Sequence, residues 1–507
     1  MQQATVAIDP AFTVAPVSRR TFGSFVEHLG RCVYTGIYEP EHPTADQDGF
    51  RQDVLELTRE LGVSAVRYPG GNFVSGYRWE DGIGPRRDRP VRRELAWHVT
   101  ETNEVGVDEF ARWCARAGVE PMMAVNLGTR GVAEALDLLE YTNHPDGTYW
   151  SQRRIDNGAT EPYDIRMWCL GNEMDGPWQI GHKTAGEYGR LAAQTARAMR
   201  MAVPDLELVA CGSSGASMPT FGAWEAEVLA ETYSDVDFIS LHAYYEEHDG
   251  DLGSFLASTM DMEHFIRSVI ATADHVGARL KSRKRIQLSF DEWNVWYMKR
   301  GQEGEAPRTG WERAPRQLED IYHLADAVVV GSMLICLLRN SDRVTAACQA
   351  QLVNVIAPIF TEPGGRAWRQ TIFHPFAQAS ALARGTVLRV EPRVADYDTL
   401  RYGPTPLVDA VATHDPETGA VALFAVSRAT TEPVTLTIDT RAFPAGLVPD
   451  ECTVLAGPDV YAVNTADDPD RVRPRPHPGV THRDGAIEVV LPPVSWNVLH
   501  LVPQSAD

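Results

Sequence analysis

Short apolar runs alternate with longer amphipathic stretches along residues 20–385. Apolar runs bounded by Gly, Pro and polar residues are typical of buried strands, and apolar residues three or four positions apart are typical of helices. The runs that we expect to be strands lie at 22–28, 64–69, 121–127, 165–173, 207–211, 237–244, 285–292 and 344–349. The clearest helical stretches between them lie at 53–61, 107–117, 184–201, 260–276 and 318–337. Eight strands joined by helical crossovers predict an α/β fold, the (β/α)8 (TIM) barrel.

The pattern changes near residue 385. Segments 420–427, 433–439 and 486–492 show β-branched residues and alternation, with Pro, Gly and Asp between them. This texture predicts a C-terminal all-β sandwich of the jelly-roll kind. Residues 4–8 and 12–14 are also strand-like, and we expect them to join the same sandwich. The predicted domains are therefore a barrel at 19–385 and a β-sandwich domain formed by 1–18 together with 386–507.

Composition and charge narrow the possible partners. The chain has 507 residues, of which 44% are hydrophobic and 23% charged, as in an ordinary globular protein. Its formal net charge of −22 argues against nucleic acid or an anionic membrane as a partner, because both bind through basic patches. A neutral sugar is indifferent to such a charge.

The cysteines and the N-terminal residues indicate the cellular compartment in which we expect the protein. The seven cysteines are scattered and form no CxxC pair, which predicts reduced, packed thiols. The first residues lack a basic region followed by an apolar stretch, and no run of about 18 apolar residues occurs. We therefore expect a cytoplasmic protein without a signal peptide.

Two of the predicted strands end in a carboxylate. Glu173 follows the run WCLGN (168–172), and Glu292 lies within LSFDEWN (288–294). A buried glutamate is costly, because burial disfavours its charged form. Two such glutamates on separate strands of one barrel form the pair that glycoside hydrolysis needs. A structural, salt-bridged carboxylate is the alternative for each.

Further hydrogen-bonding residues fall at the ends of the other predicted strands, where the active sites of such barrels lie. They are Glu27, His28, Asn72, Asn126, Asn172, His242, Tyr244 and Gln349. Each has an alternative explanation: Glu27, for example, could simply pair with Arg67. Asn172 and Glu173 alternate along a regular strand, so a bend is needed for both to reach one ligand. The two histidines fit hydrogen-bonded wall residues better than metal ligands, because no third ligand appears at a recognisable spacing.

Tryptophans gather near the same points. Sugar rings have apolar C–H faces that stack on indoles, so a tryptophan-rich rim suits a carbohydrate, although core packing explains some of these residues equally well. The candidates are Trp79, Trp97, Trp168, Trp178, Trp293, Trp296 and Trp311.

Five extended motifs carry a specific resemblance. They are RYPGGNFVSGYRWEDGIGP (67–85), WHVTETNEVGVDEF (97–110), WCLGNEMDGPWQIGHKTAGEYG (168–189), SLHAYY (240–245) and DEWNVWY (291–297). In this order they resemble the family 51 α-L-arabinofuranosidases, and the resemblance covers essentially the whole chain. It implies that Glu173 is the general acid/base and Glu292 the nucleophile. It also implies sugar contacts from Glu27, Asn72, Asn172, Tyr244 and Gln349, with Trp97, Trp178 and Trp296 on the aglycone side.

The resemblance implies a retaining, exo-acting α-L-arabinofuranosidase that needs no metal or other cofactor. Its expected partners are arabinofuranose-containing oligosaccharides or polysaccharides, and it implies a homohexamer. Three alternatives stay open at this point: another retaining glycosidase of the same clan, such as a β-xylosidase or an endo-acting glucanase or xylanase; a carbohydrate-binding protein that has lost catalysis; and metal-dependent hydrolysis. The acidic loop 246–251 is the only support for the last, and we interpret that loop as solvated surface.

Overall fold

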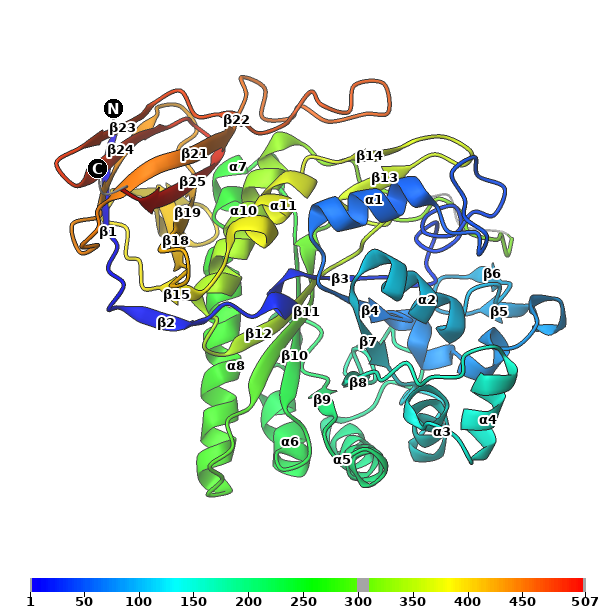
Figure 1. Ribbon diagram of the computed structural model, residues 1–507. Coiled ribbons are helices and arrows are strands. Elements are labelled where there is room, and N and C mark those ends of the chain that lie inside the picture. Colours follow the sequence, from blue (N-terminus) through cyan, green and yellow to red (C-terminus); the bar gives the residue numbers. More distant parts are fainter. Residues whose placement is uncertain (1, 299–309, 505–507) are drawn as a thin grey trace.

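The computed structural model describes residues 2–298 and 310–504, and its centre is a closed parallel barrel (Figure 1). Each strand of the barrel pairs with the next along the chain, and the last pairs with the first. The strands are β3 (Gly23–Phe25), β4 (Ala65–Tyr68), β7 (Glu120–Ala124), β8 (Met167–Leu170), β9 (Glu207–Ala210), β10 (Phe238–Tyr245), β11 (Gln287–Val295) and β12 (Val344–Gln349). Each lies at one of the predicted positions, so the barrel prediction is confirmed.

Helices surround the barrel. They are α1 (Gln52–Leu61), α2 (Val107–Ala117), α3 (Val132–Asn143), α4 (Tyr149–Asp156), α5 (Ala185–Ala202), α6 (Ala223–Thr232), α7 (Leu252–Leu256), α8 (Thr259–Arg279), α10 (Leu324–Arg339) and α11 (Phe373–Leu382). Short 3₁₀ turns lie at η1 (Arg19–Phe22), η2 (Asn72–Gly76), η3 (Trp79–Gly82) and η4 (Arg86–Asp88). The helix predicted at 318–337 begins later, at Leu324, because the Asp326 carboxylate accepts a hydrogen bond from the His323 amide (2.7 Å) and caps the helix there.

The C-terminal region folds into two facing sheets. The four-stranded sheet has the order β1 (Gln2–Ala7), β20 (Val434–Asp439), β24 (Ala486–Leu491), β23 (Val480–Arg483). The seven-stranded sheet has the order β2 (Thr13–Pro16), β15 (Thr386–Leu388), β18 (Val408–His414), β19 (Val421–Ser427), β25 (Ser495–Pro503), β21 (Leu447–Leu455), β22 (Arg475–Pro476). Three hairpins complete the strands: β5 (Arg92–Glu94) with β6 (Val99–Glu101), β13 (Ile359–Thr361) with β14 (Ala367–Arg369), and β16 (Asp396–Thr399) with β17 (Gly403–Pro406).

The N-terminal strands belong to the C-terminal sheets. Strand β1 pairs in parallel with β20, and β2 pairs antiparallel with β15. The inward side chains of both sheets share one apolar core, in which Val6 and Ile438 lie with Leu423 and Leu499. These pairings support the division of the chain that we propose, with a barrel at 19–385 and a sandwich from the two ends.

Helix α10 joins the two parts. Figure 1 shows it between the barrel and the sandwich, and it contacts β11 and β12 on one side and β18, β19 and β25 on the other. Nearly every residue of this helix is buried, as expected for a helix covered on all sides. Gly331 is where the sandwich comes closest, because a Cβ there would lie 2.4 Å from the Trp496 ring. The sandwich is therefore packed on the barrel through a continuous apolar layer.

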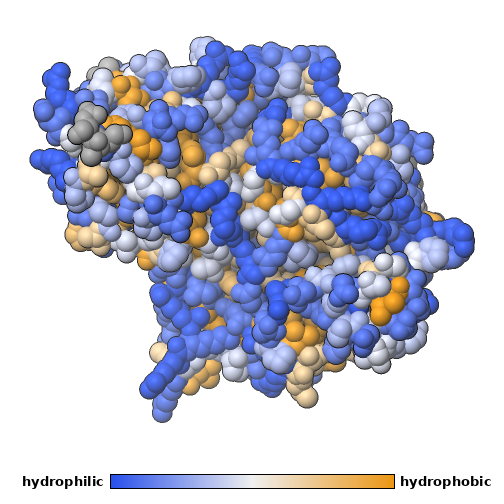
Figure 2. Space-filling view, viewed as in Figure 1, coloured by the Kyte–Doolittle hydropathy of each residue, from blue (hydrophilic) through white to orange (hydrophobic). Residues whose placement is uncertain are grey.

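The surface and the thiols agree with the composition. Figure 2 shows a face that is mostly hydrophilic, with apolar residues in small groups. All seven cysteines are free thiols, and all except the half-buried Cys452 are buried. Within residues 2–298 and 310–504, no helix is both long and apolar enough to cross a membrane.

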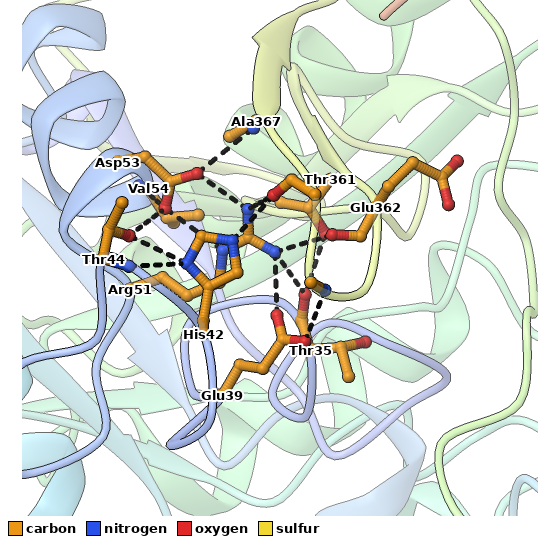
Figure 3. Close-up of polar contacts among 12 residues, drawn as sticks. Thr35, Glu39, His42, Thr44, Arg51, Asp53, Val54, Thr361, Glu362 and Ala367 are labelled. Carbon is orange, nitrogen blue, oxygen red and sulfur yellow. Dashed lines mark hydrogen bonds and ion pairs between the residues drawn. The ribbon is translucent and has the colours of Figure 1, made fainter.

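A buried arginine ties the long loop that follows β3 to the β13–β14 hairpin (Figure 3). The Arg51 guanidinium is fully buried and donates to the carboxylates of Glu39 (2.9 Å) and Asp53 (2.7 Å). It also donates to the backbone carbonyls of Glu362 (3.0 Å) and Gly365 (2.7 Å) on the hairpin side. One fully buried side chain thus satisfies two partly buried carboxylates and two backbone carbonyls.

Replacing Arg51 by Met should lower the free energy of unfolding by about 3–5 kcal/mol, because Glu39 and Asp53 lose their buried cation and two carbonyls lose a donor. Chemical denaturation of the full chain measures this. The control is Arg87→Met, since the Arg87 side chain is 86% exposed and pairs with Asp88 only at 3.7 Å; we expect a change within about 0.5 kcal/mol there. Equal losses in the two variants would contradict the role given to Arg51.

Candidate active site

The two predicted glutamates face each other at the mouth of the barrel. Glu173 follows the C-terminal end of β8, and Glu292 lies on β11. Their side chains are buried, with residue exposures of 9% and 6%. One carboxylate oxygen of each, together with a ring nitrogen of His242, lies within 4.8 Å of the others. Residues 119 positions apart along the chain therefore share one small polar site.

The backbone after β8 has the bend that the sequence requires. The strand ends at Leu170, and Gly171 has a φ of +97°, which a residue with a side chain rarely adopts. Glu173 itself has a φ of +43°. Because the chain leaves the regular strand here, Asn172 and Glu173 no longer point to opposite faces, and both reach the polar site. The strain of a non-glycine residue at positive φ at this position is typical of functional sites.

Both oxygens of Glu173 are engaged. Oε1 lies 2.9 Å from Nδ1 of His242, and Oε2 accepts a hydrogen bond of 2.8 Å from the indole N–H of Trp178. Burial raises the pKa of Glu173, and the negative charge of Glu292 raises it further. The hydrogen bonds from His242 and Trp178 act in the opposite direction. The net direction is upward, which favours a carboxyl group that holds a proton longer than a free glutamate does.

Glu292 has a different environment. Its Oε1 accepts a hydrogen bond from the Arg67 guanidinium (2.9 Å), and its Oε2 accepts one from the Tyr244 hydroxyl (2.7 Å). A buried guanidinium and a hydroxyl group therefore hold the two oxygens of this carboxylate in place. The two glutamates thus have different hydrogen-bond partners, although they lie in one site.

His242 links the two sides of the site. Its Nε2 lies 3.0 Å from Asp291 Oδ1, and its Nδ1 lies 3.6 Å from Glu292 Oε2 as well as close to Glu173. Burial alone would lower the pKa of His242, but the charge of Glu292 and the hydrogen bonds with Asp291 and Glu173 raise it to about 10. His242 is therefore an imidazolium at neutral pH, and together with Arg67 it balances the buried carboxylates.

Glu27 forms a second polar centre at the end of β3. It accepts hydrogen bonds from the Phe73 amide (3.0 Å), the Trp97 indole (2.8 Å) and the Gln351 side chain (2.8 Å). Burial is the main cause that raises the pKa of Glu27 to about 8. The alternative in which Glu27 pairs with Arg67 is wrong, because the Arg67 guanidinium donates to Glu292 and Asn172.

Most of the predicted site residues line one cavity. Its volume is about 990 Å³, and its lining includes Glu27, Asn72, Trp97, Glu173, Trp178, Tyr244, Glu292 and Trp296. Asn172 lies just behind this surface, where its Oδ1 accepts from Arg67 (2.7 Å) and its Nδ2 donates to Asn72 (3.4 Å). Trp296 packs edge-on against Tyr244, with ring centroids 5.1 Å apart.

The structure does not bring Gln349 to the cavity. Its side chain is fully buried within β12 and donates to the Asn294 side chain (3.3 Å). Gln351, two positions later, lines the cavity and holds Glu27. The strand ends at Gln349, so the residue that turns into the site is the one beyond the strand, and the prediction for Gln349 needs this correction.

The acidic loop 246–251 also differs from its interpretation as solvated surface. Glu246 is buried at 8% exposure, and Glu246, His248 and Asp251 line the far part of the same cavity. Only the tip at Asp249 and Gly250 is exposed. In the part of the chain that the structure describes, the one group of three side chains close enough to share a metal ion is Glu173, His242 and Glu292, and the loop does not contribute to it.

Sequence reasoning missed Arg67, Asp291 and Gln351 as residues of the site, and it found His242 only as a hydrogen-bonded wall residue without its charge. Arg67, His242 and Asp291 form the charged floor of the site, and Gln351 one of its walls. Arg67 carried a signal, because a cation in the middle of the apolar run at 64–69 must be buried and paired. Asp291 stands next to Glu292, and regular alternation would point the two to opposite faces; both reach Arg67 and His242 where the strand pairing shifts register between Phe290 and Trp293. The role of His242 depends on charges from two other strands and left no local signal.

The fold and the site together define a glycoside hydrolase. The defining feature is a pair of buried glutamates on the fourth and seventh strands of a (β/α)8 barrel. Comparison with known proteins gives the same class of enzyme. A family model described as the α-L-arabinofuranosidase 1 domain matches residues 57–265, and another, the α-L-arabinofuranosidase C-terminal domain, matches residues 291–495.

Relatives and solved structures give the same result. An intracellular exo-α-(1→5)-L-arabinofuranosidase of Streptomyces lividans is 61% identical over 98% of this chain and 75% of its own length. An enzyme of that name from Bacillus subtilis is 50% identical over the whole of both chains. The structure of AbfB, a family 51 α-L-arabinofuranosidase from Bifidobacterium longum, is 51% identical, covers 99% of both chains and has a TM-score of 0.95. The chain belongs to the family 51 α-L-arabinofuranosidases.

Proposed function

We propose that this chain is a retaining exo-α-L-arabinofuranosidase that releases terminal, non-reducing arabinofuranosyl residues from arabino-oligosaccharides, arabinoxylan or arabinan. The observation that carries the proposal is the pair Glu173 and Glu292, with carboxylate oxygens within 4.8 Å. Retaining enzymes hold their carboxyl groups about 5–5.5 Å apart, whereas inverting enzymes leave about 6.5–9.5 Å for a water molecule. The names of the relatives, exo-acting arabinofuranosidases, support the substrate class.

In the first step Glu292 attacks the anomeric carbon and forms a glycosyl ester. Glu173, protonated, donates its proton to the departing glycosidic oxygen, so that the leaving group departs as a neutral alcohol. The Arg67 and Tyr244 hydrogen bonds hold the Glu292 side chain in one orientation for this attack.

In the second step Glu173 acts as a base. Esterification removes the charge of Glu292, and that charge is one of the causes that raise the pKa of Glu173. Glu173 therefore ionises more readily in the intermediate and takes a proton from the incoming water. The water oxygen bonds to the anomeric carbon, the ester bond to Glu292 breaks, and the sugar leaves with its configuration kept.

The remaining polar residues recognise the furanose ring. Glu27, Asn72, Asn172, Tyr244 and Gln351 present carboxyl, amide and hydroxyl groups on or directly behind the cavity wall. Hydrogen bonds to sugar hydroxyls that strengthen in the transition state raise the rate, whereas equal binding of the ground state does not. We assign Gln351 to this set in place of Gln349.

The setting of the enzyme follows from its relatives. Several are named intracellular, and we propose that this chain also acts inside the cell on short, imported oligosaccharides. We also propose a homohexamer, on the family resemblance alone, which light scattering of the purified protein checks. The alternative of a β-xylosidase or endo-acting enzyme keeps both glutamates and differs in the ring contacts.

Hydrolysis of p-nitrophenyl α-L-arabinofuranoside, beside the β-D-xylopyranoside and the β-D-glucopyranoside, tests the function. We expect a strong preference for the furanoside and an α-configured first product by NMR. In the Glu292→Ala variant the rate should fall by at least about 10³-fold, because the nucleophile is lost. Activity on a pyranoside alone would overturn the substrate class, and a β-configured first product would overturn retention.

The Trp178 indole should shape the pH dependence. Its N–H stabilises the ionised form of Glu173, so Trp178→Phe should raise the pKa of Glu173 in the free enzyme. The high-pH limb of kcat/KM, which reports loss of the acid's proton, should then move up by about one pH unit. Trp296→Phe is the matched control, because the Trp296 N–H has no protein partner among the described residues. An unchanged limb in Trp178→Phe would contradict the role of this hydrogen bond.

Gln351 and Gln349 form a second matched pair. Gln351→Ala should lower kcat/KM for the aryl furanoside about tenfold or more, because the amide holds Glu27 and its buried Oε1 has no hydrogen-bond partner within residues 2–298 and 310–504. Gln349→Ala removes a bond to Asn294 behind the cavity and should act chiefly on the midpoint of thermal unfolding. A larger fall of kcat/KM in Gln349→Ala than in Gln351→Ala would show that Gln349, and not Gln351, contacts the sugar.

A further inference from the structure

The catalytic cavity is larger than one pentose requires. Its volume of about 990 Å³ lies at the upper end of the range of about 300–1,000 Å³ that holds drug-sized ligands. The lining does not stop at the two glutamates: it continues past the β9–α6 loop and the β10–α7 loop to residues 401 and 402 of the β16–β17 hairpin. We call this far part, bounded by lining residues from 214–218, 245–264 and 401–402, the distal crevice.

The distal crevice begins on the side of the acid. The β9–α6 loop is fastened two residues beyond Glu173, since the Ser214 amide donates to both oxygens of Asp175 (3.1 Å each) and the Ser214 hydroxyl donates to the same carboxylate. Glu27 and Asn72, which we assign to the furanose ring, follow β3 and β4, and these strands lie across the barrel from β9 and β10. With the furanose ring on that side, the leaving group is the part of the substrate that faces the distal crevice.

The far wall of the distal crevice comes from the sandwich domain. The β16–β17 hairpin is held on helix α7, because the Arg401 amide donates to the Ser254 hydroxyl (3.2 Å) and the Tyr397 hydroxyl donates to the Gly253 carbonyl (2.8 Å). The side chains of Arg401 and Tyr402 line the cavity from this hairpin. The opposite wall is Tyr245, which faces away from the barrel interior and donates to Asp261 on α8 (3.0 Å).

The chemistry of the distal crevice suits a neutral sugar chain. Aromatic rings such as Tyr245 and Tyr402 offer faces for C–H groups, and serine and charged side chains offer hydrogen bonds to hydroxyls. Three carboxylates, on Glu246, Asp251 and Asp261, line the distal crevice, and Arg401 is its only permanent cation in the described part of the chain. An anionic chain, for example one that contains uronic acids, is repelled by this excess of negative charge.

We propose that the distal crevice binds the aglycone of the substrate, a neutral oligosaccharide of more than one pentose unit, and that Arg401 and Tyr402 of the sandwich domain determine the preference for longer leaving groups. This rests on the proposed function, because it names a binding region for the same reaction. The sandwich domain then takes part in substrate selection as well as in packing.

The test compares kcat/KM for an arabinofuranosyl disaccharide, trisaccharide and tetrasaccharide in the full-length protein, with p-nitrophenyl α-L-arabinofuranoside as the reference substrate. In the unchanged enzyme, kcat/KM should rise with length by about tenfold, the size of effect expected from one stacking contact and one hydrogen bond. In Arg401→Ala and Tyr402→Ala, the ratio of the tetrasaccharide value to the reference value should fall about tenfold. Tyr402→Phe keeps the aromatic ring, so the same ratio should fall by less than in Tyr402→Ala.

The control is Leu400→Ala on the same hairpin, since Leu400 is 90% exposed and does not line the cavity; its ratio should stay unchanged. An unchanged ratio in both Arg401→Ala and Tyr402→Ala, or a kcat/KM that does not rise with chain length in the unchanged enzyme, would overturn the proposal while the enzyme still hydrolyses the reference furanoside. No hydrolysis of any furanoside would instead refute the proposed function itself. The midpoint of thermal unfolding of each variant shows whether a fall in the kcat/KM ratio comes from unfolding of the protein.

Discussion

The site depends on the compensation of buried negative charge. Glu173, Asp291 and Glu292 lie close together with little access to water, an arrangement that costs several kcal/mol unless cations and hydrogen bonds offset it. Arg67 on β4 and His242 on β10 supply that compensation, and each contacts more than one acceptor. Removing either cation would leave the carboxylates with fewer partners and an uncompensated buried charge, because Trp178, Tyr244 and the remaining cation would be the main groups left to hold them.

The same charges separate the roles of the two glutamates. Glu292 is held by a cation and a hydroxyl, whereas Glu173 lies beside Glu292 and is capped by Trp178. Chemically identical side chains thereby have different surroundings, and burial beside Glu292 raises the pKa of Glu173. The bend after β8 makes this possible, because it turns Glu173 into the site at the cost of a positive φ.

The remainder of the fold keeps these groups in place. Strand pairing fixes Arg67, His242 and Glu292 in the barrel wall, and the Arg51 network anchors the long loop between β3 and α1. The sandwich packs on the barrel through α10, and its β16–β17 hairpin reaches the far end of the catalytic cavity. The C-terminal domain is thus placed both to stabilise the barrel and to contact a long substrate.

The sequence by itself determined the barrel, the pairing of the N-terminal strands with the sandwich, the two glutamates and several of the polar and aromatic residues that line the cavity. These follow from local signals: apolar runs of strand length, periodic helices, and polar residues at strand ends. The tertiary structure alone decided that Gln351 replaces Gln349, that Arg67 serves Glu292 instead of Glu27, and that the loop 246–251 lines a cavity. Each of these features depends on where a strand ends or on which charge from another strand comes within a few ångströms. Hydrogen bonds and electrostatic interactions between distant segments produce no periodic pattern in the sequence, so they cannot be predicted from it.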